Sequence, residues 1–455
     1  MRKYFLLLVF LSTLILSSSG QHHQHERKSV LTDTGHPVSH HPGGHDTMAM
    51  EMQGVPMSHA FSLNLPMTRN GSGTGWLPDA SPMFGYMLHS RKWMYMVHGS
   101  VFLRYNNQDF TNGGIRGGDR VDAPNWFMIM GQRRVGERGL FHFSGMFSAD
   151  NLISGGRGYP LLFQTGETYK GAPLIDRQHP HDLFSEVSVS YSYAVSKKVD
   201  VFGYLGYPGE PALGPVTFMH RPSSLDNPNA PISHHWVDAT HITFGVATLG
   251  VRAGKFKLEG SSFTGREPDE ARYDFDKPTF DSWSARVSMN PGSRWALQAS
   301  HGYIKSPEQL HPEENVHKTT ASAIYNSPVK NNNYFSATAL WGLNKFKDHK
   351  GEHALLLEAA LHHKRSAIYG RYEFTEKSGE ELVLDENIFG HHSIFNVHAL
   401  TAGYNYDIIE FKKTRLAIGG NFSVNTAPGA LNDLYGKWPL SYQVYVRLYP
   451  GLLRM

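Results

Sequence analysis

Histidine and methionine side chains are concentrated near the start of the chain, where their types could bind metal ions. Imidazole nitrogen binds Cu(II), Zn(II) and Ni(II), whereas thioether sulfur selects soft ions such as Cu(I). The segment therefore predicts capture of copper or another transition metal ion. The alternative is a low-complexity spacer in which the histidines do nothing specific. The candidate ligands are His22, His23, His25, His36, His40, His41, His45, Met48, Met50, Met52, Met57 and His59.

A second group of donors lies in two stretches rich in Pro and Gly, residues 150–182 and 208–239, which are predicted to be long loops. Both loops border neighbouring strands, so we expect their ends to be close in space. Their nitrogen and oxygen donors suffice for one or two metal sites. In the alternative, the loops fold inward and the same side chains cross-link them to a barrel wall. The candidate ligands are His179, His181, Asp182, His220, His234, His235, Asp238 and His241.

The same loops leave a hydrolase open as a different class of function. Ser233 beside His234, or Ser185, would be the nucleophile of an enzyme acting on surface lipid. The Gly-x-Ser-x-Gly elbow that presents such a serine is absent. We therefore assign no catalytic residue and keep the enzyme as an alternative.

Methionine and histidine also mark the predicted inner face of the first three strands. Porin interiors usually carry charged and amide groups, so this band is a departure. It could pass soft ions between weak sites, or it could pack against an inserted loop or the N-terminal segment. The predicted lumen-lining residues are Met94, Met96, His98, Met128, Met130, His142 and Met146.

The start of the chain predicts export. In residues 1–20, Arg2 and Lys3 precede an apolar run that ends in small residues, as in a signal peptide. Residues 21–80 show no sustained period and are predicted to be a disordered periplasmic tail and linker, with residues 71–75 as a flexible glycine-rich stretch.

Residues 81–455 predict an all-β domain, a transmembrane antiparallel up-and-down β-barrel of about sixteen strands. Apolar and polar residues alternate with period two, and aromatic residues mark the strand ends, as in membrane barrels. Short and long connections alternate, which predicts periplasmic turns, outer loops and two periplasmic termini. The predicted strands are 93–105, 125–134, 138–149, 183–194, 198–207, 240–251, 254–264, 281–290, 294–304, 317–326, 334–342, 353–362, 366–375, 394–406, 412–424 and 440–449.

The composition excludes several other classes. The chain has no cysteine, which excludes disulfide scaffolds and cysteine-based zinc sites. The mature chain has no apolar stretch long enough for a membrane-spanning helix. A net charge of +3 gives no reason to expect a nucleic-acid partner.

Several loop segments carry a resemblance to a known family. Residues 155–160, 176–183, 206–215, 219–221, 230–245, 265–269 and 306–310 are similar to a group of uncharacterised outer-membrane β-barrel proteins of Gram-negative bacteria. That group tends to be encoded beside copper and other heavy-metal efflux systems. The resemblance implies an outer-membrane location and association with metal ions and periplasmic efflux components. It supplies neither an activity nor assigned ligands.

The predicted function is therefore an outer-membrane barrel, in contact with lipid, that is linked to binding or passage of copper-like soft or transition metal ions. The alternatives are the barrel enzyme described above and a general porin.

Overall fold

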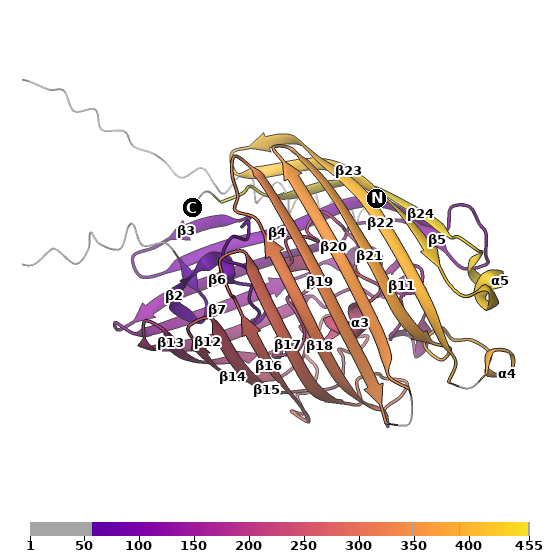
Figure 1. Ribbon diagram of the computed structural model, residues 1–455, viewed down its shortest axis with the longest axis horizontal. Coiled ribbons are helices and arrows are strands. Elements are labelled where there is room, and N and C mark those ends of the chain that lie inside the picture. The colour runs from indigo at the N-terminus through magenta and orange to yellow at the C-terminus, as the bar shows by residue number, and fades with distance from the viewer. Residues whose placement is uncertain (1–56, 348–349, 391, 454–455) are drawn as a thin grey trace, which may run out of the picture. The chain divides into compact units, whose positions relative to one another are not determined.

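Sixteen long antiparallel strands close a barrel in the computed structural model, which describes residues 57–347, 350–390 and 392–453 (Figure 1). Strands neighbouring in sequence pair with one another, and β24 closes the barrel by pairing with β4. This confirms the predicted up-and-down order. The strands are β4 Met94–Gln108, β6 Asn125–Val135, β7 Gly139–Phe147, β12 Phe184–Ser196, β13 Val199–Gly206, β14 Val246–Ala253, β15 Phe256–Phe263, β16 Ser282–Met289, β17 Trp295–Lys305, β18 Asn315–Asn326, β19 Asn333–Phe346, β20 Glu352–His363, β21 Ser366–Ser378, β22 Ile394–Phe411, β23 Thr414–Thr426 and β24 Leu440–Pro450.

Two short strands supplement the wall beside β4. This strand pairs with β6 through its first half and with β24 through its second half. The short β3 (Tyr86–His89) pairs with the first half, and β5 (Gly118–Asp122) pairs with the second half. Neither was predicted from sequence, because four or five residues hold too few alternations to stand out.

The alternation along each strand separates an apolar outer surface from a polar inner one. In β12, Val187 and Val189 are exposed, whereas Ser188 and Ser190 between them are buried. The same holds in β14, where Leu249 is 75% exposed. Successive strand residues point to opposite faces, so the barrel presents an apolar exterior and packs its polar residues inside.

Connections of different length lie at the two ends of the barrel. Short turns follow β6, β12, β14 and β20, and long loops follow β7, β13, β15 and β21. Because β4 begins and β24 ends at the short-turn end, the chain enters and leaves the barrel on the same side. The long loops hold α2 Asp150–Ser154, β8 Tyr159–Pro160, β9 Glu167–Tyr169, β10 Ala172–Leu174, β11 Arg177–Gln178, α4 Glu386–Phe389, η5 Gly429–Leu431 and α5 Asn432–Tyr435.

Residues 207–245, which we call the plug, fold into the lumen (Figure 1). They contain η3 (Phe218–His220), α3 (His234–Val237) and η4 (Ala239–His241). Trp236 is fully buried and packs with Leu340 and Leu356 of the wall. The predicted strand at 240–251 therefore begins too early. Residues 240–245 belong to the plug, where backbone hydrogen bonds join Thr243 to Gly209.

Residues 57–80 also lie in the barrel, so the prediction of a disordered linker there is wrong. They form β1 (Ser58–His59), β2 (Ser62–Pro66) and η2 (Met67–Arg69). The glycine-rich stretch is a tight turn in which Thr74 is fully buried. A Cβ on Gly71 would lie 2.3 Å from Val216 Cγ2, so glycine is needed for close approach to the plug.

Among the described residues, no helix is long and apolar enough to cross a membrane.

Candidate functional site

Buried ion pairs fasten the plug to the barrel wall. Arg221 donates to Glu358 Oε1 of β20 at 2.7 Å and to Asp238 Oδ2 at 2.8 Å. Asp226 accepts from Arg447 of β24 at 2.8 Å, and His362 Nε2 of β20 lies 2.8 Å from its other oxygen. Removing one partner of such a pair leaves an uncompensated charge, which is costly in a dry interior. The inward-folding alternative for this loop is therefore confirmed.

Five of the predicted histidines gather where the plug meets the 150–182 loop. We call His179, His181, His234, His235 and His241 the lumen histidine cluster. The ring centres of His181 and His241 are 5.5 Å apart, and those of His234 and His241 are 5.0 Å apart. The two loops thus meet, as the sequence predicts.

Acceptors hold one nitrogen of three rings in this cluster. His181 Nδ1 lies 2.8 Å from Asp150 Oδ2, His234 Nδ1 lies 2.5 Å from Asp238 Oδ1, and His241 Nδ1 lies 2.9 Å from the Asp238 carbonyl oxygen. The Nε2 atoms of His181, His235 and His241 are buried without a hydrogen-bond partner. Metal-binding histidines have this arrangement, with one nitrogen oriented by an acceptor and the other free for the ion.

The electrostatics favour neutral imidazoles at His235 and His241. Burial lowers the pKa of His235 and His241 well below the usual value, and the neighbouring His234 adds to the effect. Burial alone would raise the pKa of Asp238, but His234 and Arg221 hold that pKa well below its usual range. Neutral histidines beside an ionised carboxylate are suited to binding a cation.

The unpartnered Nε2 atoms of the cluster do not point to one common position where an ion could bind. Three histidines on one tetrahedral ion, with bonds of about 2.0–2.1 Å, have ring centres roughly 5 Å apart, which matches the spacings above. However, no three donor atoms of this cluster lie within 4.8 Å of one another in the described part of the chain. The rings would have to turn about their side-chain torsions to share an ion.

Asp182 and His220 lie outside the lumen histidine cluster. Asp182 pairs with Arg272 at 3.1 Å, and burial raises its pKa to about 6. The ring centre of His220 is 4.8 Å from that of Trp126 and 5.8 Å from that of His98. The structure therefore leaves these two predicted loop ligands outside the cluster and apart from each other in their contacts.

A methionine cluster lies against β4, β6 and β7 and borders the histidines, since Phe218 belongs to it and its ring centre is 5.7 Å from that of His234. Met96, Met128, Met130 and Met146 of the wall are buried together with Met57, Met67 and Met219 from the N-terminal segment and the plug, and Met94 is partly buried against them. The strand methionines thus pack against inserted segments, as one sequence alternative has it. His98 and His142 both have a buried Nε2 without a hydrogen-bond partner, and the His142 ring packs on Phe61.

The N-terminal candidates fall mostly outside the described residues. Met57 lies in the methionine cluster, and His59 is buried, with Nδ1 accepting from Phe61 N at 3.1 Å. The candidates outside the described residues are His22, His23, His25, His36, His40, His41, His45, Met48, Met50 and Met52.

The serines proposed for a hydrolase do not meet a histidine. Ser233 Oγ donates to Glu373 Oε1 at 3.0 Å, while His234 engages Asp238. Ser185 Oγ donates to the Asp182 carbonyl oxygen at 3.0 Å. Within the described residues no hydrogen bond joins Ser233 to His234, so the geometry offers no activated nucleophile.

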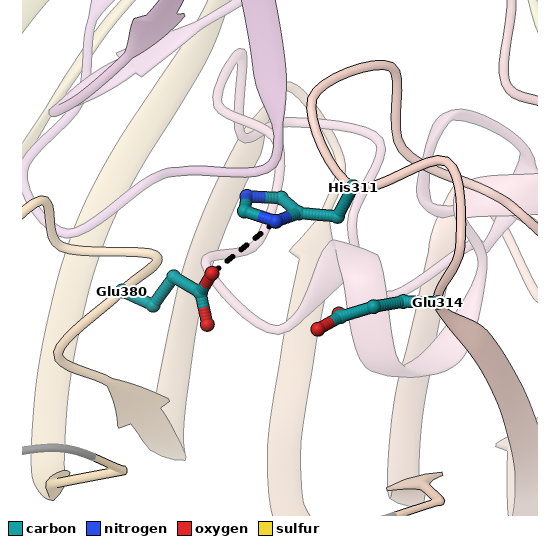
Figure 2. A group of neighbouring side chains, drawn as sticks. All are labelled: His311, Glu314 and Glu380. Carbon is teal, nitrogen blue, oxygen red and sulfur yellow. Dashed lines mark ion pairs between the residues drawn. The ribbon is translucent and has the colours of Figure 1, made fainter.

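A compact set of potential ligands lies elsewhere, at the long-loop end. One donor atom from each of His311, Glu314 and Glu380 lies within 4.8 Å of the others (Figure 2). An exposed group, Asp269, Asp274 and Asp276, meets the same distance limit. Sequence reasoning missed both sets. Loops far apart in the chain form the first, and no local spacing reports it.

Comparisons with known proteins show the fold alone. No protein-family profile and no curated protein matches the chain. Among solved structures, the chain is similar to OmpF of Salmonella typhi in complex with daunomycin, with TM-score 0.50, 9% identity, and 80% of this chain and 100% of that chain covered. An anion-selective porin from Comamonas acidovorans gives TM-score 0.46 and 13% identity over 78% of this chain and 99% of that chain. OmpT, an outer membrane protein of Vibrio cholerae, gives TM-score 0.44 and 8% identity over 80% and 99%.

Proposed function

We propose that this chain is an outer-membrane barrel with a plugged lumen that binds transition metal ions at its lumen histidine cluster. The observation that carries the proposal is the set of bare, buried Nε2 atoms on His181, His235 and His241. Asp150 and the Asp238 carbonyl already orient two of these rings. Imidazole with nearby carboxylate suits Zn(II), Ni(II) and Cu(II), in line with the copper or other transition metal that the sequence predicts.

The exterior of the barrel supports the membrane location. The outward residues of β12, β14 and β22 include Tyr191, Leu249 and Leu400, which are 45%, 75% and 54% exposed. Lipid tails would cover such an apolar surface, whereas water would not favour it. As the sequence predicts, we propose that the short turns face the periplasm and that the N-terminal candidate ligands capture ions and meet efflux components there.

The plug distinguishes this proposal from a general porin. An open porin needs a water-filled lumen, but here residues 207–245 are almost entirely buried against the wall. The plug is tied to β20 and β24 by Arg221 and Asp226. Passage of an ion would therefore require the plug to shift, and we propose metal binding as the primary property. Only the fold favours a general porin.

Metal titration of the full chain in detergent tests the proposal. Wild type and the double variant His181→Gln/His241→Gln would be titrated with Zn(II), Cu(II) and, under reducing conditions, Cu(I). The control is His301→Gln, because His301 is exposed on the outer face. We expect the double variant to lose one site or to bind about tenfold or more weakly, while the control binds as wild type does. Equal binding by all three proteins would overturn the proposal.

Deleting residues 21–56 forms a second arm of this titration. The deletion removes the N-terminal candidate ligands except Met57 and His59, and it leaves the plug and wall in place. We expect the truncated barrel to retain the site that depends on His181 and His241. If all binding disappears with the deletion, the metal site belongs to the N-terminal segment and not to the lumen.

A further inference from the structure

A pocket of about 310 Å³ lies between four long loops on the far side of the barrel from the chain ends. Residues from 166–174, 266–269, 307–314 and 378–381 line it. Eight of its twenty lining residues are acidic, against one arginine and one histidine. Arg266, the arginine, donates to Ser306 Oγ at 2.5 Å. Arg272 neutralises one of these carboxylates by pairing with Glu167 at 2.9 Å. The pocket therefore concentrates negative charge.

A possible ligand set stands at this pocket. His311 Nδ1 lies 3.2 Å from Glu380 Oε1, and a Glu314 oxygen completes the group within 4.8 Å (Figure 2). Ligands on one ion with bonds of about 2.0–2.2 Å lie roughly 3–3.5 Å apart. Both glutamates have flexible side chains and can close the remaining distance. One imidazole and two carboxylates suit Zn²⁺ or Mn²⁺ better than Ca²⁺, which takes oxygen ligands.

A buried carboxylate in the same pocket points independently to a cation. Glu352, the first residue of β20, lines the pocket and is only 4% exposed. Among the described residues it makes no side-chain hydrogen bond and no ion pair. Glu381 Oε2 is likewise buried without a hydrogen-bond partner. The buried Lys377 is the positive charge near both carboxylates, but it makes no ion pair with either of them among the described residues. Burying a carboxylate without a hydrogen-bond partner is costly, so a bound cation would stabilise this arrangement.

The neighbouring Glu308 adds another carboxylate to the pocket. It lines the pocket together with Glu314 and Glu381. The alternative is a simple surface ion pair between His311 and Glu380. Such a pair needs only one carboxylate and would not explain why the other acidic residues line the same pocket. The concentration of unpaired acids around one histidine fits a site completed by a metal ion.

We propose that this pocket binds one divalent transition metal ion, with His311, Glu314 and Glu380 as ligands and Glu352 and Glu381 as surrounding negative charge. The site is separate from the lumen histidine cluster. It lies at the long-loop end, where an ion outside the barrel would arrive first.

Binding of Mn²⁺ to the full chain, followed by loss of the free-ion electron paramagnetic resonance signal, tests this proposal. Mn²⁺ binds imidazole-rich sites weakly compared with copper or zinc, so the probe discriminates against the histidines elsewhere. We expect one saturable site. Glu314→Gln and Glu380→Gln should each weaken it on the order of tenfold or more. The control, Asp274→Asn, alters the all-oxygen group at the same end and should leave binding within about twofold.

Any one of three results would overturn the proposal. These are the absence of saturable Mn²⁺ binding by folded wild type, wild-type affinity in both glutamate variants, and displacement of the Mn²⁺ by equimolar Ca²⁺. Thermal unfolding of each variant shows that it is folded. The double variant His181→Gln/His241→Gln should bind Mn²⁺ as wild type does, which separates failure here from failure of the proposed lumen site.

Discussion

The lumen histidine cluster and the acidic pocket use similar donors in opposite surroundings. In the lumen, the buried His235 and the partly buried His241 are neutral, and the Asp238 carbonyl oxygen lies 2.9 Å from His241 Nδ1. At the pocket, the His311 side chain is 32% exposed and faces an excess of carboxylates. Affinity in the lumen thus depends on neutral imidazoles that must turn to share an ion. Affinity at the pocket depends on relief of charge repulsion.

The largest expected effect comes from releasing the plug. Arg221→Ala removes one of two charged partners from each of two buried carboxylates, Glu358 and Asp238. We expect a loss of about 3–5 kcal/mol in the free energy of unfolding, together with higher single-channel conductance. Lys255→Ala, at an exposed turn residue, is the control. Wild-type stability and conductance in Arg221→Ala would show that the plug is not held as described.

The second largest expected effect comes from replacing a residue that orients a histidine of the lumen cluster, because this change should weaken only one of the two sites. Asp150→Asn replaces the oxygen that faces His181 Nδ1 and keeps an acceptor for Asn125 N. We expect Zn(II) affinity in the lumen to fall by about 10–100-fold, with Mn²⁺ binding at the pocket unchanged. Isothermal titration with each ion measures both. A parallel loss at both sites would mean that the variant disturbs the whole barrel.

The two regions should respond to pH with opposite signs. The lowered pKa of His241 means that the unfolded chain takes up protons first, so this contribution to stability is present above about pH 6.5 and is lost as the pH falls. The raised pKa of Glu308 has the reverse effect, because its contribution is present below pH 4.5 and is lost as the pH rises to about 8.

Unfolding midpoints measured from pH 5 to 9 test these signs. Relative to wild type, His241→Gln should flatten the acid side of the profile and Glu308→Gln the alkaline side, each by a few °C. Profiles parallel to wild type in both variants would contradict the assignment.

The smallest expected effect concerns the methionine cluster. Met128 is 4% exposed among other thioethers and the plug. If the cluster serves packing, Met128→Leu preserves volume and should change the free energy of unfolding by less than about 1.5 kcal/mol, with Cu(I) stoichiometry unchanged. Loss of one Cu(I) equivalent in titration would instead assign a soft-metal site to this wall.

Local alternation made the barrel predictable, since each strand reports its two faces in its own sequence. Val187 and Ser188 show that period without any knowledge of neighbours. The plug was harder to predict, because residues 208–239 are inside only by virtue of partners such as Glu358 and Arg447, which lie far along the chain. For the same reason, residues 71–75 resembled a flexible linker. Their glycines instead allow contact with Val216.

The two candidate sites also differ in how far the sequence predicts them. The meeting of His181 with His241 followed from two loops bordering neighbouring strands, which is a topological argument available from sequence. The grouping of His311 with Glu380 depends on the closed barrel bringing distant loops together. No spacing along the chain encodes that contact.

The most direct test of the central claim is an anomalous difference map from crystals of the full chain soaked in Zn(II). The account predicts a peak in the lumen about 2.0–2.1 Å from Nε2 of both His181 and His241. That peak should vanish in the double variant His181→Gln/His241→Gln. A lumen without an anomalous peak, while both histidines keep Nε2 bare, would contradict it.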